Sequence, residues 1–287
     1  MKKRKILPIL LTTAVIAAGA AVLILKPSLR YIAKDTLSGL FRRDPLTEIN
    51  ADDLILETYS LAALLADVNV TFDQSMMLIN STTPVPSGFE AELAEYNGSG
   101  VIMNRCVTEA YRALAADVAE RFDEKLFIRS AYRTAEEQAD AIAAEGDKAA
   151  DTGASEHQTG LALDVYIRYF AGAGFLDSDV GQYVNRNCQK HGFIIRYPYY
   201  GEKSTGMGFE PWHLRYVGHP HAGIMAESRM TLEEYMDFLG TGTFYQYEDY
   251  LISVQTSEPF LLPEAWESAV LSPDNRGNTV ITVRMAG

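Results

Sequence analysis

The most prominent feature of the hydrophobic pattern is a run of twenty uncharged residues at 6–25. The run is apolar on all sides, follows Lys-Lys-Arg-Lys at 2–5 and is closed by Lys26. A helix of about 20 residues spans about 30 Å, the thickness of the hydrocarbon core of a bilayer. Because basic flanks stay in the cytoplasm, the pattern predicts an uncleaved single-pass anchor within 1–27. The alternative is a cleaved signal peptide, whose apolar run is usually shorter, about 7–15 residues.

Beyond this run, the polar and apolar positions predict helices and short strands without regular alternation. Residues 107–118 carry an apolar stripe on one helix face, and two Thr-x-x-Glu capping boxes, at 134–137 and 231–234, predict the start of two further helices. Another helix is expected from about 180 to 191, ending at Gly192. The short apolar runs that predict strands are 126–132, 161–167, 193–197 and 213–217. This mixture indicates an α+β fold.

Four regions are expected along the chain. Residues 1–27 hold the basic stub and the membrane anchor, and residues 28–70 form a juxtamembrane connector that mixes charges with short apolar patches. The main domain is expected over 71–240. Residues 241–287 contain short β-like runs split by prolines, and they are expected to form a β-rich extension of unknown role.

Composition and charge narrow the function classes. The chain has 47% hydrophobic residues, which excludes a wholly disordered chain and a multi-span membrane protein. It has 25 Lys plus Arg against 38 Asp plus Glu, a net charge of −13, so no nucleic-acid partner is expected. Two cysteines, Cys106 and Cys188, cannot form a thiolate zinc cage. A disulfide between them stays open, and it would need Cα atoms within about 7 Å of each other.

The first segment with candidate chemistry is Ser-Ala-Tyr-Arg-Thr at 130–134. Arg133 lies at the exit of a predicted strand, just before the start of a predicted helix, where anions bind well. The segment therefore predicts a site for a carboxylate or an oxyanion. The alternative is an ordinary surface arginine.

The second segment, 153–165, places His157 and Asp164 on the two sides of Gly160. Asp164 lies inside an apolar strand pattern, and a buried carboxylate is costly unless it is paired or bound to a metal. With His157 it offers one oxygen and one nitrogen ligand to Zn²⁺. The alternative is a structural aspartate beside a loop histidine.

The third segment, 209–216, contains Glu210 and His213, three residues apart, where a glycine-rich loop meets a predicted strand. His213 can supply a third ligand, which leaves a fourth position open for water, as in catalytic zinc sites. Glu210 would then lie beside the metal without binding it, as a base that takes a proton from water.

Together the three segments resemble the zinc D-alanyl-D-alanine carboxypeptidases of the VanY type, a family that also holds D,D-dipeptidases and L,D-carboxypeptidases. The family has a motif like Ser-Gly-Tyr-Arg-Ser, followed by Glu-Glu-Gln; this chain reads Ser-Ala-Tyr-Arg-Thr at 130–134, with Ala131 in place of the usual glycine, and Glu-Glu-Gln at 136–138. The motif Ser-x-His-x-x-Gly-x-Ala-x-Asp is met in full at 155–164, and Glu-Pro-Trp-His-x-Arg-Tyr-Val-Gly is met in full at 210–218. The resemblance covers roughly residues 75–238.

The resemblance implies a small antiparallel sheet flanked by helices and a bound Zn²⁺. The zinc ligands that it implies are His157, Asp164 and His213. The catalytic residues that it implies are Glu210, as the base, and Arg133. The substrate contacts that it implies are Arg133, Gln138 and Ser155.

The expected function is removal of the C-terminal D-Ala from peptidoglycan stem peptides that end in D-Ala-D-Ala. A domain held outside the cytoplasm at the cell membrane would reach this substrate. A D,D-dipeptidase, an L,D-carboxypeptidase and a catalytically silent wall-binding module stay open as alternatives. Wall remodelling and glycopeptide resistance both fit the expected activity.

Overall fold

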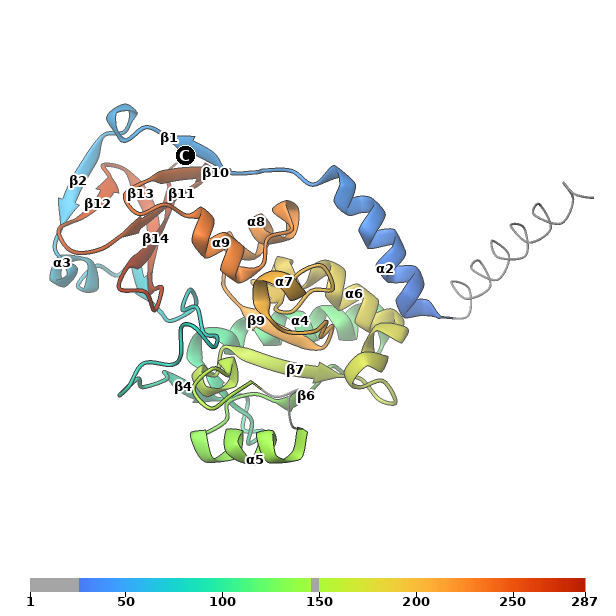
Figure 1. Cartoon of the computed structure of the whole chain (residues 1–287). Coiled ribbons are helices and arrows are strands. Elements are labelled where there is room, and N and C mark those ends of the chain that lie inside the picture. The colour runs from blue at the N-terminus through green and yellow to red at the C-terminus, as the bar shows by residue number, and fades with distance from the viewer. Residues whose placement is uncertain (1–25, 146–149, 287) are drawn as a thin grey trace, which may run out of the picture.

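The computed structural model describes residues 26–145 and 150–286, which form two larger β-sheets with helices packed around them (Figure 1). The predicted membrane segment, 6–25, lies outside the described residues. Within the described part of the chain, no helix is long and apolar enough to cross a membrane. The mixed α+β class expected from the sequence is confirmed.

The smaller sheet is antiparallel and has four strands in the order β6-β7-β9-β8. The strands are β6 (Phe127–Ser130), β7 (Ala162–Tyr166), β8 (Phe193–Ile195) and β9 (His213–Tyr216). Each lies within one of the four apolar runs that predicted a strand. This sheet is the small antiparallel sheet that the resemblance implied.

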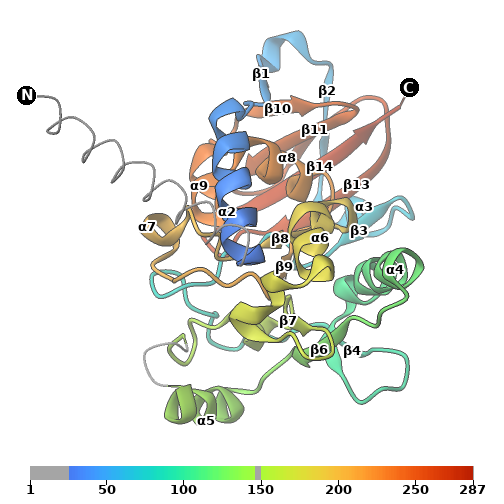
Figure 2. The same cartoon turned by 90° about the vertical axis from the view of Figure 1, so that its right-hand side faces the viewer.

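Three helices surround the small sheet: α4 (Arg105–Phe122), α5 (Ala135–Glu145) and α6 (Asp179–Asn187). The apolar stripe of α4 is buried and belongs to the same core as the inner side chains of β7. The capping box that predicted α5 is formed, since the Glu137 carboxylate accepts from the Thr134 backbone N–H and the Thr134 hydroxyl accepts from the Glu137 N–H. Figure 2 shows α5 at one end of the molecule, away from the larger sheet.

The larger sheet has six strands in the order β1-β10-β11-β14-β13-β3, and only the β13–β3 pair is parallel. The early strands are β1 (Thr47–Ile49) and β3 (Val70–Phe72). The late strands are β10 (Phe244–Tyr247), β11 (Tyr250–Gln255), β13 (Trp266–Pro273) and β14 (Thr279–Met285). Residues expected as a connector, 28–70, and as an extension, 241–287, therefore build one sheet together.

Both faces of the larger sheet are covered. Helices α8 (His221–Ser228) and α9 (Leu232–Phe238) pack on one face. The other face is covered by α3 (Leu61–Leu65) and by the antiparallel pair of β2 (Leu56–Tyr59) and β12 (Phe260–Pro263). Because the central strands are buried on both sides, β11 and β14 carry apolar side chains on both of their faces.

The remaining elements connect these layers. Helix α2 (Pro27–Ser38) runs along the outside of the molecule beside the 3₁₀ turn η5 (Gly172–Asp177), where the Asp177 carboxylate accepts from the Ser28 N–H. Short elements complete the fold: β4 (Leu93–Glu95), β5 (Ile102–Asn104) and α7 (Glu202–Thr205). Cys106 and Cys188, the pair left open for a disulfide, are both free thiols.

Candidate active site

Strand register brings the three motif segments together. In the small sheet, Asp164 on β7 is paired with His213 on β9 and with Ser130 on β6. Directly opposed residues of antiparallel strands have Cα atoms about 4.5–5.5 Å apart. The carboxylate of the second segment therefore lies between the histidine of the third segment and the strand end that leads to Arg133.

His157 reaches the same place from the 3₁₀ turn η4 (Glu156–Thr159). The turn ends at Gly160, which has φ of +71°, and a Cβ there would lie 2.6 Å from the Asn104 backbone nitrogen, so only glycine fits. His157 Nδ1 lies 2.7 Å from the Ala131 carbonyl oxygen. Because a carbonyl only accepts, Nδ1 carries the proton and Nε2 keeps its lone pair for a metal.

The two histidines and the aspartate converge on one point. His157 Nε2 lies 3.4 Å from Asp164 Oδ2, and His213 Nδ1 lies 3.0 Å from Asp164 Oδ1. One ligand atom from each of the three residues falls within 4.8 Å of the other two. Two imidazole nitrogens and one carboxylate oxygen suit Zn²⁺ and leave a coordination position open. The structure thus brings together all three residues that the sequence analysis predicted as ligands.

The charges around these residues favour a cation. Burial alone would raise the pKa of Asp164, but His157 and His213 hold it well below its usual range. Burial lowers the pKa of His157. Burial also opposes the charged form of His213, but Asp164, together with the carboxylates of Glu156 and Glu210, raises the pKa of His213 to about 10. Asp164 and Glu210 thus place negative charge directly beside the imidazole of His213, where a divalent cation would be attracted.

Glu210 lies beside the ligand cluster. Its Oε2 is 3.7 Å from His213 Nδ1, and its side chain is 20% exposed toward the cavity. The Glu210 backbone N–H donates to the Tyr197 carbonyl oxygen at 3.0 Å, which fixes the loop before β9. A partly exposed carboxylate next to a candidate metal is suited to exchange protons with water.

Arg133 lies on the opposite side of Asp164. Its guanidinium donates to Ser130 Oγ at 2.8 Å, to Gln138 Oε1 at 3.0 Å and to Asp164 Oδ2 at 3.3 Å. Gln138 is fully buried and also donates to the Ala150 carbonyl oxygen. Gln138 therefore fixes the direction of Arg133, and the guanidinium stays 20% exposed.

One cavity of about 500 Å³ joins these groups. All seven residues that the sequence analysis assigned to the site line it: Arg133, Gln138, Ser155, His157, Asp164, Glu210 and His213. Further walls come from Tyr197, Met207, Phe209 and Trp212. The cavity combines an apolar wall with convergent ionisable groups, the usual composition of a ligand site.

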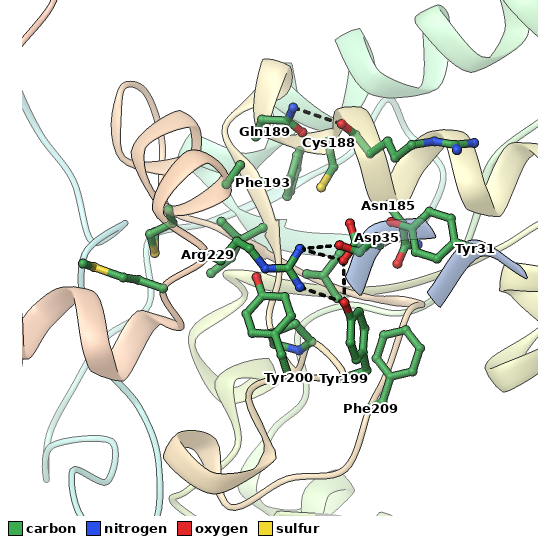
Figure 3. A pocket seen from close by; sticks show the side chains of 17 residues that line it. Tyr31, Asp35, Asn185, Cys188, Gln189, Phe193, Tyr199, Tyr200, Phe209 and Arg229 are labelled. Carbon is green, nitrogen blue, oxygen red and sulfur yellow. Dashed lines mark hydrogen bonds and ion pairs between the residues drawn. The ribbon is translucent and has the colours of Figure 1, made fainter. Parts of the chain in front are cut away.

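A second cavity, of about 210 Å³, lies between α2 and the domain (Figure 3). Arg229 donates to Asp35 Oδ2 and to Tyr199 Oη, both at 2.8 Å, and the Tyr199 hydroxyl donates to Asp35 Oδ2 at 2.8 Å. Phe209, next to Glu210, lines both cavities, and its ring centroid is 5.8 Å from that of Tyr199. Arg229 and Asp35 neutralise each other, and among the described residues this cavity holds no cluster of metal-binding side chains, so we place the chemistry in the cavity of about 500 Å³.

The sequence analysis missed a buried ionic cluster under the site. Glu156, Arg196 and Arg215 have no exposed surface. Glu156 Oε1 accepts from Arg196 Nε at 2.7 Å and from Arg215 Nη1 at 2.6 Å. The only signal in the sequence was that Arg196 and Arg215 lie in otherwise apolar strand patterns, as Asp164 does. A buried charge in an apolar strand is costly unless it is paired, and this reasoning, which identified Asp164, applies to both arginines as well.

A cluster of two histidines and one carboxylate, with a partly exposed glutamate and an arginine in the same cavity, is the arrangement typical of metal-assisted hydrolases. Comparison with known proteins identifies the family. The family model described as VanY: D-alanyl-D-alanine carboxypeptidase matches residues 101–219. A D-alanyl-D-alanine carboxypeptidase of Enterococcus faecium is 31% identical in an alignment that covers 71% of this chain and 70% of the relative. The chain belongs to the VanY family of D-alanyl-D-alanine carboxypeptidases, which are peptidases.

Further relatives agree with this family. A bifunctional D-Ala-D-Ala dipeptidase and carboxypeptidase of Enterococcus gallinarum, VanXYC, is 31% identical over 58% of this chain and 95% of the relative. The solved structure of VanYB in complex with D-alanine-D-alanine has 29% identity and a TM-score of 0.51, and covers 58% of this chain and 99% of that chain. The D,D-dipeptidase VanXYg, at 24% identity and a TM-score of 0.63, covers 80% of this chain and 99% of that chain and shows the fold alone.

His221, which follows the third motif in sequence, lies outside the ligand cluster. It is buried at the start of α8, with Nδ1 2.8 Å from Tyr235 Oη and Nε2 2.8 Å from Thr282 Oγ1. Burial, with a smaller contribution from His219, lowers the pKa of His221 to about 3. His221 therefore joins α8 to α9 and to β14 as a neutral side chain.

We expect this histidine to make stability depend on pH. An unfolded histidine has a pKa of about 6.5, so between this value and about 3 the unfolded chain binds a proton that the folded protein excludes. The free energy of unfolding should fall by up to about 1.4 kcal/mol for each pH unit below 6.5. Urea unfolding measures this change in both proteins. Between pH 7 and pH 5, the free energy of unfolding should fall by about 2 kcal/mol less in His221→Gln than in wild type. Equal losses would contradict a neutral, buried His221.

Proposed function

We propose that this protein is a zinc-dependent D,D-carboxypeptidase that removes the C-terminal D-Ala from peptidoglycan stem peptides ending in D-Ala-D-Ala. The observation that carries the proposal is the convergence of His157, Asp164 and His213 beside Glu210 and Arg133 in one cavity. The activity in the name of the E. faecium relative supports the reaction, and the D-alanine-D-alanine bound to VanYB supports the substrate class.

The proposed metal ligands are His157 through Nε2, Asp164 through a carboxylate oxygen and His213 through Nδ1. The choice of atoms is supported by the hydrogen bond of His157 Nδ1 to the Ala131 carbonyl and by the direction of His213 Nδ1 toward Asp164. When bound there, Zn²⁺ would supply a Lewis acid that polarises the scissile carbonyl and lowers the pKa of water to about 7.

Glu210 is the proposed general base. Its carboxylate faces the ligand cluster from the loop and stays partly exposed to the cavity. In this position Glu210 can accept a proton from the attacking water and then donate it to the amine of the leaving D-Ala. One carboxylate thereby serves both proton transfers of the hydrolysis.

Arg133 is the proposed anchor for the negative charge of the substrate. Its guanidinium donates hydrogen bonds to Ser130, Gln138 and Asp164. These bonds orient the group before the substrate binds. A charge-assisted bond from this group would hold the terminal carboxylate of the peptide or the developing oxyanion. Gln138 would act by orienting Arg133, and Ser155, buried in the cavity wall, is the further proposed substrate contact.

The substrate preference is tested by mass spectrometry of a stem pentapeptide, a stem tetrapeptide and the free D-Ala-D-Ala dipeptide, each incubated with the purified protein. We expect release of one D-Ala from the pentapeptide, and loss of this activity in a chelator with recovery when Zn²⁺ is added back. Hydrolysis of the dipeptide as well would indicate the bifunctional activity of VanXYC. Release from the tetrapeptide alone would indicate an L,D-carboxypeptidase, and no product from any peptide would overturn the proposal in favour of a silent wall-binding module.

The role of Glu210 is tested by Glu210→Gln, which keeps the shape of the side chain and removes the base. We expect zinc content to stay at the wild-type level and kcat to fall by about 10²–10⁴-fold. The matched control is Glu202→Gln, an exposed glutamate on α7, which should leave kcat unchanged. Wild-type turnover by Glu210→Gln would assign the base to another residue.

We further infer that residues 6–25 anchor the protein in the cell membrane, with the catalytic domain outside the cytoplasm. The support is the twenty-residue uncharged run and the basic residues before it. The full chain should then fractionate with membranes, and a chain without residues 2–25 should fractionate with soluble proteins. Recovery of the full chain among the soluble proteins of the cell would contradict the anchor.

A further inference from the structure

Two buried side-chain atoms next to the ligand cluster have no hydrogen-bond partner among the described residues: Glu156 Oε2 and His213 Nε2. They face each other at 3.9 Å. A buried polar atom without a partner costs free energy, so such atoms in a native fold need an explanation. One of the two atoms can donate a hydrogen bond and the other can accept it.

The proposed metal site determines where the proton of His213 must be. His213 Nδ1 is the ring nitrogen that faces Asp164 and Glu210. An imidazole binds a metal through a lone pair, so Nδ1 must then be deprotonated and the proton of the neutral ring must be on Nε2. The Nε2–H group needs an acceptor inside the protein, and the acceptor that it faces is Glu156 Oε2.

Glu156 cannot easily turn this oxygen away, because its other oxygen is held on two sides. Oε1 accepts from Arg196 Nε and from Arg215 Nη1. Arg196 is held in turn by the Glu233 carboxylate of α9, and Arg215 by the backbone carbonyl oxygens of Ser75 and Met77. The ionic cluster therefore fixes the plane of the Glu156 carboxylate and directs Oε2 toward His213.

We propose that Glu156 is a positioning residue of the metal site: its Oε2 accepts from His213 Nε2–H and holds His213 in the tautomer that leaves Nδ1 free to bind the metal. The inference rests on the proposed zinc site but assigns a role to a residue outside the ligand set and the catalytic pair. The 3.9 Å separation exceeds a hydrogen bond by about 1 Å, so the proposal requires the imidazole to move toward Glu156. Such outer contacts fix the tautomer and the ring orientation of metal-binding histidines.

The substitution Glu156→Gln tests the proposal because the arginines dictate how the new amide must lie. Arg196 and Arg215 require an acceptor at the position of Oε1, so the amide oxygen takes that place and the NH₂ group points at His213 Nε2. A donor there favours an unprotonated Nε2, which puts the proton on Nδ1 and blocks the metal. We expect the affinity for Zn²⁺, measured by competition with a chelator, to fall by about 10–100-fold.

The matched control is Glu233→Gln. Glu233 pairs with the same Arg196 and lies at the other end of the cluster, so its substitution also removes one carboxylate from the buried arginines. We expect Glu233→Gln to unfold at lower urea concentration than wild type, as Glu156→Gln does, and to keep the wild-type affinity for Zn²⁺. Equal losses of affinity in both variants would mean that the cluster acts only through stability, and would overturn the proposal.

A second measurement needs only the wild-type protein and so does not depend on the folding of a variant. In the zinc-loaded protein, ¹H–¹⁵N NMR of the histidine rings should show that His213 carries its proton on Nε2, in a signal shifted downfield by a hydrogen bond and slow to exchange. A His213 Nε2 proton that exchanges as fast as one in water would overturn the proposal. A wild-type protein that binds no Zn²⁺ at all would instead overturn the proposed function.

Discussion

The structure depends on the pairing of one buried carboxylate with two buried arginines. Glu156, Arg196 and Arg215 are fully removed from solvent, and an isolated charge in such a place costs several kcal/mol. Removing any one of the three groups would therefore leave a buried charge without a partner and lower the stability of the fold. Glu156 comes from the turn that carries His157, Arg196 follows β8, and Arg215 lies on β9 two residues after His213. The cluster thus joins the segments from which the site is built.

The same cluster links the small sheet to the larger one. Arg215 is bonded to the carbonyl oxygens of Ser75 and Met77, and between them the Met76 N–H donates to Ser272 Oγ of β13. Arg196 reaches α9, which packs on the larger sheet, through Glu233. A chain of short, buried hydrogen bonds therefore connects the larger sheet to the floor of the site. This gives residues before 80 and after 240 a structural connection to the chemistry, although the cavity itself is lined from 129–213.

The sequence predicted the site better than it predicted the whole fold, for a physical reason. The proposed ligands lie in short motifs, two of them on strands whose periodicity is visible, and one strand register then places Asp164 opposite His213. The runs that became β11 and β14 were also visible because they are apolar on both faces. The edge strands β1 and β3 have three residues each, too few for a periodicity to appear, and their pairing with β10 and β13 joins residues about 200 positions apart. Glu156 was missed because its neighbours in sequence are polar, so nothing local signals that it is buried.

The environment gives different roles to the carboxylates of one small site. Asp164 lies on a strand between two imidazoles, which keep it ionised and so available as a ligand. Glu156 is enclosed by arginines, which keep it ionised and fixed in direction. Glu210 lies on a loop at the cavity wall, where its carboxylate meets solvent and can exchange protons. Glu210 is the most exposed of the three, so its carboxylate has the easiest access to water. The division of labour that we propose between ligand, support and base therefore follows from where the backbone places each side chain, since the carboxylate chemistry itself is the same in all three.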